Sequence, residues 1–89
     1  MDYSKGQVVF SKNGRTKGKA LMVINIEDDY LHLADGGLWP LAKPKRKKPK
    51  HVQPTHYVDS VIYEKLTNNY PLTDSDIRKS LKEYEGKAS

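Results

Sequence analysis

Residues 19–26 constrain the fold more than any other part of this chain, because their side chains are largely apolar on both sides. Strand geometry sends alternate side chains to opposite faces, with Met22, Ile24 and Ile26 on one and Leu21, Val23 and Asn25 on the other. A strand with two apolar faces requires cover on both of them. We therefore predict that this segment is the central strand of a small β-structure.

Further short segments around it have strand signals and are separated by tight turns. These segments are Gln7–Ser11, Tyr30–Ala34 with Leu31 and Leu33 inward, 38–41, and 51–53. Pro40 cannot donate to a ladder, so 38–41 should be an edge strand or contain a bulge, and Pro54 should end the last strand. Five short strands in about 50 residues indicate a small, strongly bent all-β barrel.

The last third of the chain shows helical spacing instead. Val58, Val61, Ile62 and Leu66 predict a short helix over 59–67, which the Asn-Asn-Tyr-Pro sequence at 68–71 ends. We expect residues 1–56 to form the barrel and residues 57–89 to form a helical appendage.

A second helix should begin at Thr73, where Asp76 completes a capping box and Leu72 can meet Ile77 as a hydrophobic staple. Gly86 should end it. Its apolar stripe consists of Ile77, Leu81 and Tyr84. The stripe indicates that this helix covers part of the barrel or a partner.

Composition excludes several protein classes. The 89 residues include no Cys, so disulfide frameworks, zinc knuckles and thiol nucleophiles are not expected. No run of about 18 apolar residues is present, and the first residues lack the apolar stretch of a signal peptide. A cytoplasmic protein without a membrane partner is expected.

Positive charge is concentrated in the first part of the chain. The net charge is +5 overall, with +6 in residues 1–56 and −1 in residues 57–89. Six of the eight residues 43–50 are Lys or Arg, two are Pro, and none is acidic. Such a run repels itself, resists helix formation and needs counterions or an anionic partner. It is either a phosphate-contacting strip or a solvated loop, such as a localisation tract.

A second basic cluster precedes that run, around Gly14 and Gly18. Arg15 can fork onto a phosphate, while Lys17 and Lys19 act as point charges. Glycine permits close backbone approach to a sugar-phosphate chain, although glycines in a turn can also serve the turn alone. Trp39 offers a stacking face for a base, or else belongs to the core.

Catalysis is not expected from these residues. His32, His51 and His56 have no nucleophile elbow beside them, and no Cys or nearby acid completes a metal site. Asp28 and Asp29 fit a solvated hairpin turn, and the Gly14 turn lacks the ending of a phosphate-binding loop. We therefore expect no enzyme activity, no cofactor and no small-molecule substrate.

Two stretches resemble the KOW family of small RNA-binding modules. The first comprises Gln7-Val8-Val9, Gly14-Arg15-Thr16-Lys17-Gly18-Lys19 and the strand at 21–26. The second comprises Ala34-Asp35-Gly36 and the Pro-Lys-rich run that ends in Lys50-His51. Together they are similar to the small KOW-domain proteins of Gram-positive bacteria, relatives of an archaeal and eukaryotic large-subunit ribosomal protein. The chain departs from their pattern at Thr16, Ala20 and Trp39.

The resemblance implies a five-stranded SH3-like barrel of KOW type whose basic residues face RNA. It assigns this role to Arg15, Lys17, Lys19, Lys45, Arg46, Lys47, Lys48, Lys50 and His51, and we add the adjoining Lys12 and Lys43. Ribosomal RNA or the ribosome is then the expected partner, contacted through phosphates and 2′-hydroxyls.

Two other functions stay open at this point. An SH3-like module could bind a peptide or an acidic partner through an aromatic groove formed by Tyr30, Trp39 and Tyr57. Non-specific DNA binding is the other possibility.

Overall fold

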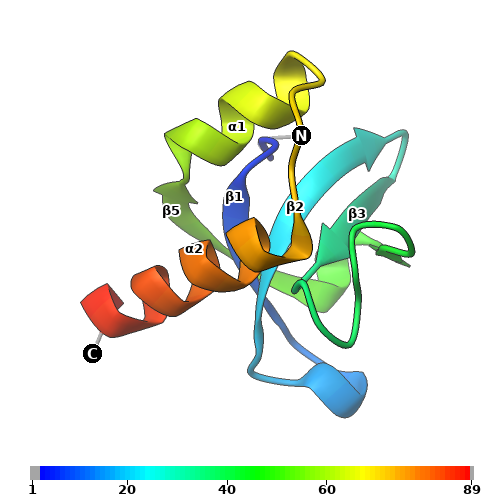
Figure 1. Cartoon of the computed structure of the whole chain (residues 1–89). Coiled ribbons are helices and arrows are strands. Elements are labelled where there is room, and N and C mark those ends of the chain that lie inside the picture. Colours follow the sequence, from blue (N-terminus) through cyan, green and yellow to red (C-terminus); the bar gives the residue numbers. More distant parts are fainter. Residues whose placement is uncertain (1–2, 89) are drawn as a thin grey trace.

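The computed structural model describes residues 3–88, which form one antiparallel sheet and two helices (Figure 1). In chain order the elements are β1 (Gln7–Ser11), the 3-10 turn η1 (Gly14–Thr16), β2 (Ala20–Glu27), β3 (Tyr30–Ala34), β4 (Lys45–Lys47), the 3-10 turn η2 (Pro49–His51), β5 (Val52–Val58), α1 (Ser60–Thr67) and α2 (Asp74–Ala88). The chain is therefore a small mixed α/β domain rather than the mainly β domain that we predicted.

The sheet is open. Its strand order is β4-β3-β2-β1-β5, and within residues 3–88 the two outer strands do not pair with each other. The predicted closed barrel is therefore wrong in this respect. The sheet is nevertheless strongly bent. The bend brings Leu31 and Leu33 of β3 into one core cluster with Val52 of β5, although the two strands are not neighbours in the sheet.

The central strand is β2, as predicted, and it is buried on both faces. Met22 faces the helices, where it packs with Ile62 and Ile77. Leu21 and Val23 face the concave side of the sheet. A register shift between Val23 and Asn25 reverses the alternation, so Ile26 packs against the same cluster as Leu21 and not with Met22 as predicted.

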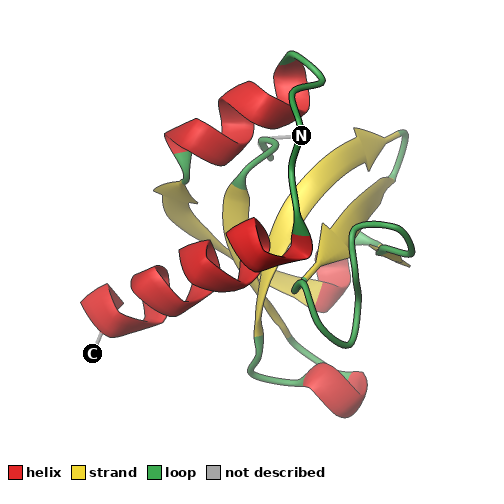
Figure 2. Cartoon of the chain, viewed as in Figure 1, coloured by secondary structure: helices red, strands yellow, loops and turns green. Residues whose placement is uncertain are grey.

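The two helices cover one face of the sheet (Figure 2). Asp59 caps α1 by accepting hydrogen bonds from the backbone N of Val61 and Ile62, at 3.0 and 3.1 Å. The predicted capping box of α2 is confirmed: Thr73 N donates to Asp76 Oδ2 at 3.0 Å, and Asp76 N donates to Thr73 Oγ1 at 3.2 Å. Among the described residues, no helix is both long enough and apolar enough to cross a membrane.

Gly86 does not end α2, which continues to Ala88. A terminating glycine usually takes a positive φ, and Gly86 is not among the glycines that do so here. One glycine in a helix costs only about 1 kcal/mol relative to alanine. The last turn of α2 therefore continues through it.

The predicted strand at 38–41 does not form, and β4 lies in the basic run instead. Asp35 Oδ1 accepts hydrogen bonds from the backbone N of Gly37 and Trp39, at 2.9 and 2.8 Å, and Leu41 N donates to Asp74 Oδ1 at 2.7 Å. These bonds use backbone groups that a ladder would need. The chain pairs again only further along, where Lys45 and Lys47 lie opposite Leu33 and Leu31.

The last strand is longer than predicted. It runs through Pro54, which is tolerated because β5 is an edge strand that pairs only with β1, in a part of that pairing where the register shifts. The predicted division between residues 56 and 57 therefore falls inside β5. His51, predicted to start this strand, is the last residue of η2.

Candidate nucleic-acid interface

The strand β4 divides the basic run between two faces. The ammonium groups of Lys45 and Lys47 lie 6.0 and 5.7 Å from the centroid of the Trp39 ring. Arg46 and Lys48 lie over the ring of Tyr30 instead, at 4.2 and 5.7 Å. Successive side chains of a strand point to opposite faces, and these four basic side chains follow that pattern. The basic run therefore presents two separate cationic faces, each beside one aromatic ring, and does not form one continuous strip.

Lys47 joins β4 to the turn after β1. Its Nζ donates to Ser11 Oγ at 2.9 Å and to the backbone O and Oδ1 of Asn13, both at 3.3 Å. Partial burial and the charge of Lys45 lower the pKa of Lys47. This lysine therefore brings the basic run against the Gly14 turn.

The turn itself is fixed by short polar contacts. The buried Thr16 donates from Oγ1 to Ser11 Oγ at 3.1 Å, and Ser11 Oγ contacts the backbone O of Asn13 at 2.9 Å. His51 Nδ1 lies 2.8 Å from Asn13 Nδ2, and Lys12 N donates to the backbone O of His51. Thr16, one of the departures from the KOW pattern, thus has a structural role.

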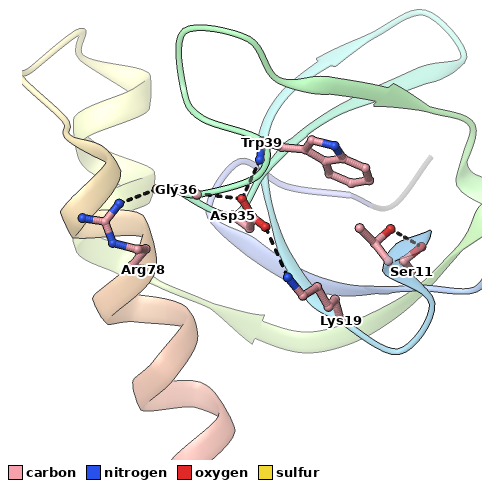
Figure 3. Close-up of polar contacts among 8 residues, drawn as sticks. Ser11, Lys19, Asp35, Gly36, Trp39 and Arg78 are labelled. Atoms are coloured by element: carbon pink, nitrogen blue, oxygen red, sulfur yellow. Dashed lines mark hydrogen bonds and ion pairs between the residues drawn. The ribbon is translucent and has the colours of Figure 1, made fainter. Parts of the chain in front are cut away.

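Arg15, Lys45 and Lys47 line one hollow of about 280 Å³. The other lining residues are Gly14, Thr16, Leu38 and Trp39, and no acidic residue is among them. Figure 3 shows the Trp39 side chain projecting from the loop after Asp35 toward the turn at Ser11. The fold therefore brings together two basic segments that lie about thirty residues apart in the sequence.

Lys19 lies elsewhere. Its Nζ is 4.0 Å from Asp35 Oδ2 (Figure 3). It also lines a separate hollow with Arg78, Lys82 and Glu85. The remaining predicted lysines are exposed and do not line the Trp39 hollow: Lys12, Lys17, Lys43 and Lys50. They add positive potential without belonging to the hollow.

The three aromatic residues predicted to form a groove pack in different places. Tyr57 contacts Tyr84 at 5.2 Å between ring centroids, on the helix side of the sheet. Trp39 packs against the cluster on the other face, and Tyr30 lies beneath Arg46. Tyr57 is therefore not part of a groove with Trp39.

The sequence interpretation missed three residues of this region: Ser11, Asn13 and Leu38. Leu38 is 61% exposed, and it lines the hollow. The Asp-Gly-Gly sequence before it could have indicated this, because an Asx-type turn at Asp35 forces the following residues out of the sheet.

Two of the histidines contact different side chains. His32 Nε2 lies 3.4 Å from Glu27 Oε2, while His51 contacts Asn13. Across residues 3–88, no group of three or more His, Cys, Asp or Glu side chains is placed to hold a metal ion.

No protein-family model matches the chain, and no curated protein matches it.

Proposed function

We propose that this protein binds structured RNA through the hollow lined by Arg15, Lys45 and Lys47 and through the cations around it. The observation that carries the proposal is the convergence of these three cations from two distant segments, without an acidic residue in the lining. Such a surface attracts a polyanion and repels cationic molecules.

We also propose that the domain is a KOW-type variant of the SH3-like fold. Three features support this assignment: the order of the strands in the sheet, the strong bend of the sheet, and the basic turn between β1 and β2. In this variant the open edge between β4 and β5 replaces full closure.

The mechanism follows from the chemistry of the cations. The guanidinium of Arg15 is suited to bidentate contact with a phosphate, and the Lys45 ammonium acts as a point charge. Arg46 and Lys48 extend the contact on the other face of β4. Contacts to phosphates and 2′-hydroxyls select RNA by shape, which fits ribosomal RNA in the cytoplasm as the partner.

A pair of double variants tests this proposal. Arg15→Ser with Lys45→Ser removes two charges from the hollow, and Lys79→Ser with Lys82→Ser removes two charges from exposed positions of α2. Fluorescence anisotropy with a labelled RNA hairpin should show affinity falling about fivefold or more per lost phosphate contact at about 0.1 M salt for the first pair only. Equal effects of the two pairs would contradict the proposed location of the site.

Two binding comparisons separate the alternatives. Co-sedimentation with ribosomes at low salt, with release by nuclease, supports RNA as the partner; retention after nuclease treatment would indicate a protein partner. Tighter binding to duplex DNA than to a structured RNA at the same salt concentration would favour the DNA alternative.

A further inference from the structure

Phosphate binding alone leaves part of the Trp39 hollow without a role. Besides three cations it has an apolar wall formed by Leu38 and Trp39. Leu38 is 61% exposed, although nothing in backbone recognition requires an exposed leucine beside a lysine pair. A hollow lined by cations and by apolar side chains fits a ligand that has both an anionic group and a flat apolar face.

The wall is held in place before any ligand arrives. The backbone N of Trp39 donates to Asp35 Oδ1 at 2.8 Å, and its backbone O accepts from Asp35 N at 2.9 Å. The same loop is held against α2 by two hydrogen bonds. Arg78 donates to the backbone O of Gly36 (Figure 3), and Leu41 N donates to Asp74. Preorganisation of this kind reduces the ordering cost of binding.

We propose that the hollow receives one unpaired nucleotide of the RNA. Its base packs on Leu38 and on Trp39, in place of the lysine ammonium groups that lie over the Trp39 ring, and its phosphate contacts Arg15 and Lys45. This inference rests on the proposed RNA binding and names the RNA feature that the site selects. A volume of about 280 Å³ lies at the low end for ligand pockets, about 300–1,000 Å³, and suits a single base.

The chemistry favours an unpaired nucleotide over a paired one. Bases in an A-form helix are stacked on both sides, and a side chain can reach their flat faces only where the base is splayed out of a loop or bulge. Gly14 leaves room for such a nucleotide, because a Cβ built at this position would meet nothing within 4 Å. An acidic peptide without aromatic residues supplies the charge but no aromatic face for Trp39.

Trp39 is the only tryptophan in the chain, so its fluorescence reports directly on the hollow. We would titrate the protein with two RNA hairpins, both closed by a non-nucleotide linker so that neither has an unpaired loop base, which differ only in one single-nucleotide bulge. The bulged hairpin should quench Trp39 fluorescence and bind roughly 5- to 150-fold more tightly than the fully paired one, as expected for one base stacked on an aromatic side chain. Little quenching is expected from the paired hairpin.

Matched variants then locate the preference. Trp39→Leu should remove the preference for the bulge while keeping the salt-dependent binding of the paired hairpin. Tyr30→Leu is the control, because Tyr30 also lies beneath basic side chains but does not line the hollow. If Trp39→Leu does not fold, Leu38→Ser can be used instead, because Leu38 is exposed. This variant should weaken the preference for the bulged hairpin without changing the melting temperature of the protein.

Three results would overturn the inference. They are equal affinity of the native protein for both hairpins, a preference for the bulge that is undiminished in Trp39→Leu or Leu38→Ser, and equal quenching by polyglutamate at the same charge concentration. In the first two cases, the proposed RNA binding would still be supported if the paired hairpin binds in a salt-dependent way. Failure to bind either hairpin at low salt would instead contradict the proposed function itself.

Discussion

Gly36 lies where the loop that holds Trp39 meets α2. Its φ is +78°, and a Cβ at this position would collide with the backbone O of Asp74 and approach the side chain of Arg78. Gly14 has almost the same φ, +77°, but open space around its Cβ position. The two glycines therefore separate backbone strain from steric collision.

We predict that Gly14→Ala lowers the free energy of unfolding by about 1 kcal/mol, from the left-handed backbone alone. Gly36→Ala should lower it by clearly more, about 2 kcal/mol or above, because the loop must also move away from α2. Urea denaturation of both variants measures the difference. Equal losses of unfolding free energy in the two variants would mean that the loop can move away from α2 without an energetic cost.

Residue chemistry was the part of the site most accessible from the sequence. The basic character of Arg15, Lys45 and Lys47 could be read directly, and they do line one hollow. The position of Lys19 could not, because its pairing with Asp35 depends on a loop conformation that no local rule specifies. The exposure of Leu38 was likewise hidden, since an apolar residue in a strand-like segment is expected to face the core.

At the scale of elements, Asp59 links the two helices. One carboxylate oxygen caps α1, and the other accepts a hydrogen bond from Ser80 Oγ of α2 at 2.5 Å. Asp59→Ala should cost about 2 kcal/mol of stability, because it removes both the cap and the link.

Ser80→Ala is the matched control, since it removes only the link and should cost about 1 kcal/mol. Thermal denaturation of both variants, with helix content followed by circular dichroism, tests this ordering. A larger loss for Ser80→Ala than for Asp59→Ala would show that the cap contributes little.

Elements with local signals were predicted better than those that depend on a distant partner. The helix start at Thr73 follows from a capping box within four residues, and β2 follows from its own apolar pattern. The strand β4 was missed because a Lys-Arg-Lys sequence has no strand signal of its own. It pairs because β3 offers a free edge and because an edge strand leaves its charged side chains in water.

For the whole molecule, the helices complete the core and are more than an appendage. Ile77 of α2 is fully buried and packs with Met22 and Val8 of the sheet. We predict that Ile77→Ala costs about 2–5 kcal/mol, a large part of the stability of a domain of this size. Val61→Ala, at a 61% exposed position of α1, should change stability by less than about 0.5 kcal/mol.

Chemical denaturation of the two variants provides the measurement. If Ile77→Ala unfolds at nearly the same denaturant concentration as the native protein, the contact between α2 and the sheet does not stabilise the domain.

The strand count and the strong bend of the sheet could be anticipated from short strands and turns. Its open edge could not, because closure depends on whether β4 and β5 meet.

If the cationic surface binds RNA by neutralising phosphates, as we propose, the affinity must fall as the salt concentration rises. The affinity of the native protein for a structured RNA hairpin is measured across a series of salt concentrations. If about six phosphates are neutralised, log K should fall with log salt at a slope of roughly −4 to −5. A slope near zero would contradict the account, because no binding dominated by phosphate contacts can be insensitive to salt.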